Sequence, residues 1–365
     1  MSFVVKALFP GMLLDSATRW ARDAAGRYPE AASTQVIGEL GWNAVLVPES
    51  AGGAGGSFSD FASIVEGLAT HAVALPVVTR CGIVPTMLDA LADGDAARSL
   101  LAAVADGSAI IELGGSLNGQ SEEPLLAREQ AGKWELSGCI PNIALTEECT
   151  HALLVARNAG DGSPMVFIAR RQELDGEAAA YTSMDERGVC AYRMESMSLP
   201  ASAMLASGAE AARAIEAGWR LAVCATAADT VCAMGSALEH TIAYLRERHQ
   251  FGQSLSRFQV LRHDVARLYI IYELARGLLQ ASLDTMQAPL DSRQAKAAFD
   301  LLGLFTGQEA IRFAEMVIQL HGGMGMTKEL PAARLATRML ANALRFDDPL
   351  SHLYCLHDFR TKTRP

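Results

Sequence analysis

The sequence predicts an α+β protein of three parts: an N-terminal helical domain over residues 1–107, a middle antiparallel β-domain over 108–206 and a C-terminal four-helix bundle over 207–365. Three observations support this division. Apolar residues recur at helical spacing near both ends, short β-prone runs fill the middle, and 365 residues suffice for two or three domains. Hydrophobic residues make up 50% of the chain, so a sizeable core is available.

The N-terminal part reads as helices joined by glycine- and proline-rich turns, with Ala17 and Ala21 among the apolar positions at helical spacing. One turn is rich in glycine: Leu40-Gly41-Trp42 is followed by 45–49 and by Gly52-Gly53-Ala54-Gly55-Gly56. So many glycines indicate unusual backbone angles or the close approach of another group; the alternative is a flexible surface loop.

Short β-prone runs dominate the middle part. They cover residues 109–111, 134–136, 152–156 and 166–169, and glycine-containing turns separate them. Because no long helix lies between these runs, we expect an antiparallel sheet or a small barrel.

Four helices in succession are predicted for the C-terminal part. Residues 209–246 are alanine-rich without proline, 258–286 and 292–320 repeat apolar residues at three and four, and a shorter helix runs from 331 to 344. Gly322-Gly323 ends the third helix, as a C-terminal capping glycine would. This order predicts a bundle.

The composition argues against several kinds of partner and site. Thirty-one Lys and Arg against 41 Asp and Glu give a net charge of −10, which disfavours nucleic acid or an anionic membrane as the main partner. Seven scattered cysteines without a C-x-x-C pair indicate reduced thiols in a cytoplasmic protein, with no disulfide framework or metal site. The N-terminus makes a poor signal peptide, and we expect no membrane span, which needs roughly 18 apolar residues.

The first motif with chemical meaning follows the first helix of the predicted bundle. It reads Arg248-His249-Gln250-Phe251-Gly252, with Phe258-Gln259 shortly after. Arginine offers a rigid fork of donors that suits phosphate, and Phe251 offers a flat apolar surface that suits a ring system. The alternative is ordinary chemistry at a helix C-terminus, where arginine and glycine satisfy the last carbonyls.

The second motif lies between the third and fourth helices and reads Gln319-Leu320-His321-Gly322-Gly323-Met324-Gly325. Glycines there let the backbone approach a large ligand, and exposed amides can bind phosphate oxygens. It follows a helix and is not G-x-G-x-x-G, so the dinucleotide fingerprint does not apply. The alternative is a tight turn between two helices.

These motifs, in this order on this layout, resemble the acyl-CoA dehydrogenase family of flavoproteins. The stretch from Leu40 to Gly53 is similar to the family's N-terminal helical domain, and 248–259 and 319–325 are similar to its two C-terminal signatures. The resemblance extends from about residue 10 to residue 355, and is weaker in the middle.

The resemblance implies a cofactor, a reaction and an assembly. FAD would bind at a subunit interface, where Arg248, Gln250 and Phe251 of one chain reach the flavin of a neighbour, while Gln319, Gly322 and Gly323, on the mate, line the adenosine diphosphate portion. A carboxylate would remove the α-proton of an acyl-CoA while the β-hydrogen leaves as hydride to the flavin, giving a trans-2-enoyl-CoA. An electron-transferring flavoprotein would accept the electrons, and the functional unit would be a homo- or heterotetramer with a related subunit.

The segment that carries the family's catalytic glutamate differs here. It reads Arg345-Phe346-Asp347-Asp348-Pro349, so Asp347 takes the place of the base, with Asp348 as the alternative. Aspartate is one methylene shorter, and a misplacement of about 1 Å can cost on the order of 100-fold in rate. The family's second location for the base falls near Ala222-Val223, which cannot act, and Glu216 is out of register. A solvated turn at 347–349 is the other interpretation.

The middle part also departs from the family pattern, because Glu112–Asn118 replaces a Thr-Glu-Pro…Gly-Ser-Asp segment and Gly138-Cys139-Ile140-Pro141 lacks a lysine. Arg248 and Gln250, which would serve a neighbour, are intact. This asymmetry resembles subunits of heteromeric bacterial members that act on bulky acyl groups, including steroid-derived ones. The alternatives are a degenerate, non-catalytic structural partner and an acyl-CoA oxidase.

Overall fold

The computed structural model describes residues 3–25, 32–119 and 123–362. The chain divides into two compact units. The first, called the helical unit here, contains Met1–Tyr28, Ala62–Ala74 and Val223–Pro365; the second, the sheet unit, contains Pro29–Phe61 and Leu75–Ala222. The N-terminal 107 residues are thus shared between the units, although secondary structure changes from helix to strand between residues 105 and 111 and back to helix at 208.

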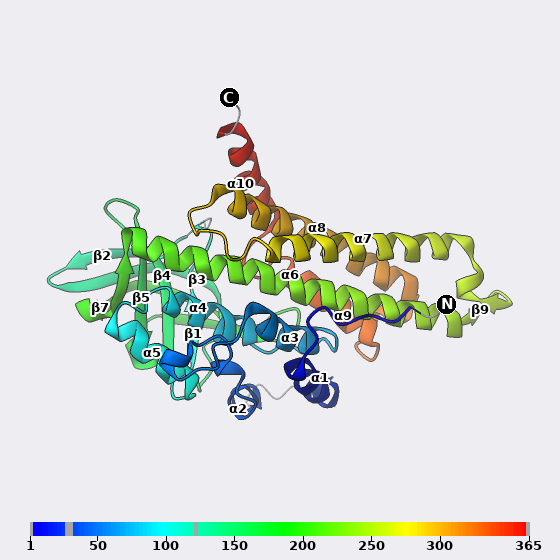
Figure 1. The fold of residues 1–365 in the computed structure, drawn as a ribbon, viewed down its shortest axis with the longest axis horizontal. Helices are drawn as coiled ribbons and strands as arrows, with labels where there is room; N and C mark the ends of the chain where they lie inside the picture. The colour runs from blue at the N-terminus through cyan, green and yellow to red at the C-terminus, as the bar shows by residue number, and fades with distance from the viewer. Residues whose placement is uncertain (1–2, 26–31, 120–122, 363–365) are drawn as a thin grey trace. The chain divides into compact units, whose positions relative to one another are not determined.

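The sheet unit is built on an eight-stranded sheet with the order β6-β7-β3-β2-β4-β5-β8, and β1 pairs with β4 (Figure 1). The strands are β1 (Ile111–Gly114), β2 (Leu126–Gln130), β3 (Lys133–Ile143), β4 (His151–Asn158), β5 (Pro164–Arg170), β6 (Glu177–Thr182), β7 (Gly188–Pro200) and β8 (Met204–Ser207).

Most neighbouring strands of this sheet are antiparallel, as predicted, but β4 pairs in parallel with both β1 and β2. The sheet is therefore mixed: the predicted antiparallel pairing holds for most strands but not for the pairs that β4 forms with β1 and β2. Its buried core includes Leu136, Leu154, Phe167 and Met194. Trp134 packs edge-on against Phe167 with ring centroids 5.6 Å apart.

Helices and an ordered turn complete the sheet unit. The helices are α2 (Ala32–Glu39), α4 (Val84–Asp89), α5 (Asp95–Ala105), two short 3₁₀ turns over Trp42–Ala44 and Glu49–Ala51, and a π-helical turn over Val78–Ile83. The glycine-rich turn is fixed in place, because Gly56 donates to the Val45 carbonyl and a Cβ at Gly53 would collide with Val47. The interpretation of this segment as a flexible loop was wrong.

The helical unit contains α1 (Met12–Ala24), α7 (Gln259–Leu283), α8 (Arg293–His321), α9 (Pro331–Asn342) and α10 (Pro349–Lys362). It also takes most of α3 (Phe58–Ala69) and the longer part of α6 (Gly208–Glu247). All four predicted helices are present. The last helix, α10, was not predicted, because its start at Asp348-Pro349 was read as a turn that ends a helix.

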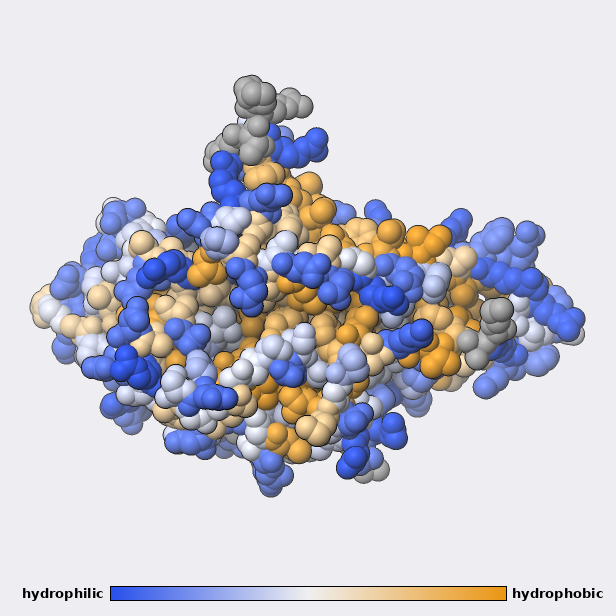
Figure 2. Space-filling model, viewed as in Figure 1, coloured by the Kyte–Doolittle hydropathy of each residue, from blue (hydrophilic) through white to orange (hydrophobic). Residues whose placement is uncertain are grey.

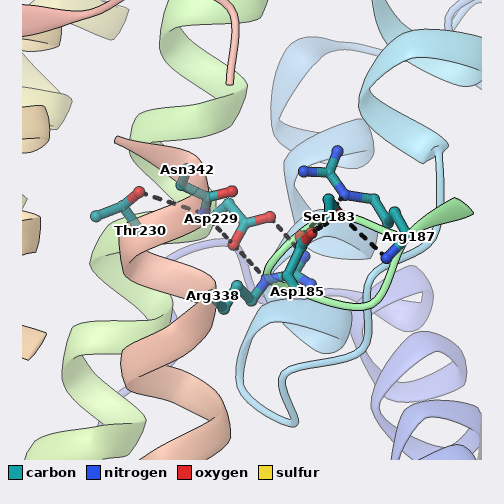
Figure 3. Close-up of polar contacts among 7 residues, drawn as sticks. All are labelled: Ser183, Asp185, Arg187, Asp229, Thr230, Arg338 and Asn342. Carbon is teal, nitrogen blue, oxygen red and sulfur yellow. Dashed lines mark hydrogen bonds and ion pairs between the residues drawn. The ribbon is translucent and has the colours of Figure 1, made fainter. Parts of the chain in front are cut away.

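Buried polar groups hold the helical unit together. The Asp229 carboxylate on α6 accepts two hydrogen bonds of 2.6 Å from Arg338 and one of 2.8 Å from Asn342, both on α9 (Figure 3). Glu66 on α3 accepts hydrogen bonds from the backbone N–H groups of Leu8 and Phe9, which fixes the N-terminal segment.

A smaller polar cluster lies in the sheet unit. Asp185 accepts hydrogen bonds from Ser183 and Arg187, also drawn in Figure 3, and these bonds order the turn between β6 and β7.

Helix α6 is long and apolar enough to cross a membrane, which the sequence analysis did not anticipate, but 89% of its most apolar window is buried within the protein. Alanine-rich faces of this helix therefore serve packing, as in the core helix of many proteins. No other helix of the described residues reaches that length and hydropathy.

Candidate functional site

The first predicted motif forms a β-hairpin at the end of α6. Strands β9 (His249–Gln250) and β10 (Gln253–Ser254) pair around Phe251-Gly252, whose φ angles are +55° and +79°. Two-residue turns with positive φ at both positions favour Asn-Gly. A phenylalanine there bears a conformational cost of about 1–2 kcal/mol, and its side chain is also 86% exposed. A residue that is unfavourable on both counts points to a contact with another molecule.

The polar side chains of this hairpin are available to a ligand. Arg248 and Gln250 are exposed, and neither side chain makes a hydrogen bond or ion pair with any residue that the structure describes. Phe258 packs edge-on against Phe251 with ring centroids 6.0 Å apart, which steadies the exposed ring. A fork of charged donors therefore stands beside a flat apolar surface, as binding of a diphosphate joined to a ring system requires.

The second predicted motif begins where α8 ends. His321 is the last residue of α8, and a 3₁₀ turn covers Gly322–Met326. Gly325 is required by packing, because a Cβ there would lie 2.5 Å from the Ile318 carbonyl oxygen, and Gly322 adopts a φ of +58°. Neither packing nor backbone conformation requires glycine at 323, because its φ is not positive and a Cβ would meet nothing within 4 Å. Its backbone is open to another molecule, and Gln319 and Gly322 are exposed beside it.

The structure brings the two motifs together within one chain. Tyr244, one turn before Arg248, donates a hydrogen bond of 3.3 Å to the carbonyl of His321, and the two rings lie 4.5 Å apart at 30°. The C-terminal ends of α6 and α8 therefore meet, and both carry partial negative charge. An anionic ligand at this place depends on a cation such as Arg248. The residues present fit FAD, since phosphate, ring and backbone contacts are all available.

The two candidate bases lie in the connection between α9 and α10 and have different surroundings. Asp348 is exposed and caps α10 by accepting hydrogen bonds from the Leu350 and Ser351 amides and the Ser351 hydroxyl. Burial alone would raise the pKa of Asp348, but these hydrogen bonds and the nearby His352 together lower it. A carboxylate that is already fully engaged as a cap is a weak base.

Asp347 is buried, with 3% of its side chain exposed, and its carboxylate lies 3.8 Å from Nε2 of His352. Nδ1 of His352 is in turn 2.9 Å from the carboxylate of Asp300 on α8. The imidazole fits between the helices only because residue 303 is glycine, since a Cβ there would collide with the ring.

This Asp300–His352–Asp347 cluster was not predicted from the sequence. Asp300 and Gly303 stand three residues apart on α8, but nothing in the sequence indicated the unpredicted α10 that carries His352.

The altered segment of the sheet unit contains a second buried charge. Glu112 on β1 forms a buried ion pair with Arg80, and Arg80 also donates to the Thr146 hydroxyl at 3.3 Å. Glu112 is thus already neutralised within the chain. Two thiols lie in this environment, and burial raises the pKa of Cys81 to about 12 and that of Cys149 to about 11, so both are unreactive.

An open pocket of about 700 Å³ lies next to this region of the sheet unit. Its walls come from the β3–β4 connection (Leu145–Glu148) and from the facing ends of β6 and β7, including Tyr181 and Cys190. The Tyr181 hydroxyl donates to the Pro141 carbonyl at 2.8 Å, which holds one wall in place. None of the predicted site residues lines this pocket.

Comparison with known proteins agrees with these features. Residues 5–108 match the model of the acyl-CoA dehydrogenase N-terminal domain, and residues 201–344 match that of the acyl-CoA dehydrogenase C-terminal domain. The chain is 25% identical over 315 residues to acyl-CoA dehydrogenase FadE12 of Mycobacterium tuberculosis, covering 82% of this chain and 80% of that protein.

Two solved structures have a similar fold. The ChsE4–ChsE5 complex from Mycobacterium tuberculosis gives a TM-score of 0.81 at 17% identity and covers 100% of both chains. A variant of the Tcur3481–Tcur3483 steroid acyl-CoA dehydrogenase gives 0.80 at 21% identity, covering 96% of this chain and 97% of that one. With both family models matched, this chain belongs to the acyl-CoA dehydrogenase family, and its cofactor is FAD.

Proposed function

We propose that this chain is one subunit of a heteromeric, FAD-dependent acyl-CoA dehydrogenase. The reaction is the α,β-dehydrogenation of a bulky acyl-CoA thioester, such as a steroid-derived one, to the trans-2-enoyl-CoA. Two similar structures, a two-component complex and a steroid acyl-CoA dehydrogenase, support this assignment. We further propose a cytoplasmic enzyme whose electron acceptor is an electron-transferring flavoprotein.

One contrast within the chain supports a heteromer. The flavin-binding motifs are exposed and have free donors, at Arg248 and Gln250. Two carboxylates of the altered segments, by contrast, are engaged within the chain: Glu112 pairs with Arg80, and Asp348 caps α10. A chain with this asymmetry is suited to supply flavin contacts to a related subunit.

When bound, FAD would supply the acceptor for the hydride that leaves the β-carbon of the substrate. This chain contributes binding and orientation. Arg248 would neutralise phosphate charge next to two helix C-termini, and Phe251 would offer an apolar surface to a ring. The open backbone at Gly323 would allow close approach of the adenosine diphosphate portion. Because these residues lie at one end of one chain, we propose that both motifs of one protomer serve the same flavin.

For proton removal we propose Asp347 rather than Asp348. Asp347 is held out of bulk water beside His352, whereas Asp348 is exposed and caps a helix. A general base must reach the α-carbon, and burial favours proton transfer near working pH.

Apolar side chains exposed on the helical unit support assembly with a second subunit. Tyr269, Ile270 and Leu274 on α7 and Leu353 on α10 are all exposed, and Figure 2 shows hydrophobic surface along α7. Exposed apolar patches of this kind mark association surfaces.

The test is to purify the chain alone and after co-expression with a related subunit from a neighbouring gene. The heteromer predicts yellow colour and flavin bleaching by an acyl-CoA only in the mixture. Colour and bleaching in the chain alone contradict it in favour of a self-sufficient homotetramer. A chain that is colourless in both preparations supports the alternative of a structural partner. Oxygen consumption during bleaching identifies an oxidase.

A further inference from the structure

We propose that Tyr244 and His321 are positioning residues that hold the two flavin-binding motifs at a fixed distance, so that Arg248 and the glycine turn act on FAD as one unit. This inference rests on the proposed FAD site and adds two residues that are not expected to touch the cofactor.

Tyr244 lies just before the hairpin and reaches the end of a second helix. The backbone N–H of Arg248 donates to the Tyr244 carbonyl at 2.9 Å, so Tyr244 forms the last helical turn before the hairpin. Its phenol donates to the carbonyl of His321, which is the residue directly before Gly322. The Tyr244 side chain therefore connects the ends of two helices, through a contact between residues 77 positions apart in the sequence.

The orientation of the His321 ring is fixed by a hydrogen bond within its own helix. Its side chain is buried, and Nδ1 lies 2.9 Å from the Val317 carbonyl of the same helix. A carbonyl only accepts, so Nδ1 carries the hydrogen and the ring plane is fixed. The Tyr244 ring then packs on a fixed imidazole, with centroids 4.5 Å apart at an angle of 30°.

The turn that follows His321 is rich in glycine and therefore has high conformational freedom before it is ordered. Gly322, Gly323 and Gly325 stand within four residues, and glycine loses more conformational freedom on ordering than any other residue. Without an anchor, ligand binding would have to order this turn, at a cost in affinity. The anchor at His321 orders the start of the turn before FAD arrives.

The test measures FAD affinity by fluorescence quenching in the assembly that retains FAD, whether the chain alone or with its partner. Tyr244→Phe removes only the hydrogen bond, and we expect FAD affinity to fall about 2- to 12-fold, as for a neutral hydrogen bond. Tyr244→Leu also removes the ring contact, and we expect a larger loss. Tyr272→Phe alters a buried phenol on α7 that touches neither motif, and it should leave FAD affinity unchanged.

A double-mutant cycle separates positioning from general stability. Arg248→Ala should lower FAD affinity at least about 10-fold in the wild-type background but less than about 3-fold in the Tyr244→Leu background, because the arginine is no longer held in place. Equal effects of Arg248→Ala in both backgrounds, or unchanged affinity in both Tyr244 variants, overturn this inference and leave the FAD site intact. A wild-type protein that binds no FAD in any assembly overturns the proposed function, and this inference with it.

Discussion

The Arg338 guanidinium and the Asp229 carboxylate form a buried, two-point ion pair, with both N–O distances at 2.6 Å. This pair joins α9 to α6, and Asn342 adds a third hydrogen bond to the same carboxylate. Breaking one partner of such a pair leaves an uncompensated charge, whereas the pair itself contributes little net stability relative to apolar packing.

Asp229→Ala should therefore lower the free energy of unfolding by about 3–5 kcal/mol, because the buried Arg338 loses the two hydrogen bonds that this carboxylate accepts. Urea denaturation followed by circular dichroism measures this change. The control is Arg267→Gln, which breaks an exposed pair with Asp264 and should cost no more than about 0.5 kcal/mol. Equal effects of the two substitutions would contradict the assigned role of Asp229.

Substituting two neighbouring glycines should give opposite results. Gly323→Ala places a methyl group in open space, so stability should stay within about 0.5 kcal/mol while the FAD content of the purified protein falls. Gly325→Ala forces a methyl group against Ile318 and should cost about 1–3 kcal/mol. The melting temperature checks the effect on stability, and the ratio of absorbance at about 450 nm to that at about 280 nm checks the FAD content. Undiminished FAD in the Gly323→Ala protein would remove the turn from the cofactor site.

The hairpin turn offers a substitution that should stabilise the chain and weaken its function. Phe251→Asn creates the Asn-Gly pair that positive φ angles favour, so the apoprotein should gain about 1 kcal/mol. FAD affinity should fall several-fold, since an aromatic contact contributes about 0.5–1.5 kcal/mol. Thermal unfolding of the apoprotein and FAD titration measure the two effects. Lower stability together with unchanged affinity would show that Phe251 serves the fold.

Stability of the helical unit should decrease as the pH falls below about 6.5, the ordinary pKa of histidine. Burial lowers the pKa of His71, His240 and His321, so the unfolded chain binds more protons than the folded one below that value. The free energy of unfolding is then fully present above pH ~6.5 and is lost as pH drops, by at most about 1.4 kcal/mol per pH unit for each histidine.

Urea denaturation at pH values from about 8 to about 5 tests this dependence. His321→Gln should make the decline less steep, whereas His263→Gln, at an exposed position on α7, should leave it as in the wild type. An unaltered slope in the His321→Gln protein would contradict the contribution of this residue.

The two aspartates before α10 should separate in function. Asp347→Asn should slow exchange of the substrate α-proton with deuterated water by about 100-fold or more, the usual effect of removing a general base. Asp348→Asn should change little, because asparagine caps a helix equally well, whereas Asp348→Ala should cost about 1 kcal/mol of stability. If neither Asn variant slows the exchange in an active assembly, the base lies on another segment or on the partner subunit.

Much of this fold could be predicted because helical spacing and β-prone runs are local signals. The four predicted bundle helices are present, and the four predicted β-prone runs overlap β1, β3, β4 and β5. The strands β2, β6, β7 and β8 were not predicted. The parallel pairing of β4 with β1 and β2 was missed, because the partner of a strand depends on the whole sheet rather than on its own residues. Helix α10 was missed because Asp-Pro starts a helix as readily as it forms a turn.

The parts of the candidate site that could be predicted are those whose residues are contiguous in the sequence. Arg248–Gly252 and Gln319–Gly325 are such segments, and each contains exposed residues. The contacts that organise the site join distant residues: Tyr244 with His321 over 77 positions, and Asp300 with His352 over 52. No periodicity or spacing in one sequence reveals such pairs.

Gly303 lies inside α8, where glycine costs a helix about 1 kcal/mol relative to alanine. The imidazole of His352 occupies the space that any side chain at 303 would fill. A change to alanine, which would strengthen most helices, would here push away the ring and the start of α10 with it. The contact between His352 and α8 thus depends on the absence of a side chain at residue 303. Whether α10 stays packed against α8 is decided by that one glycine.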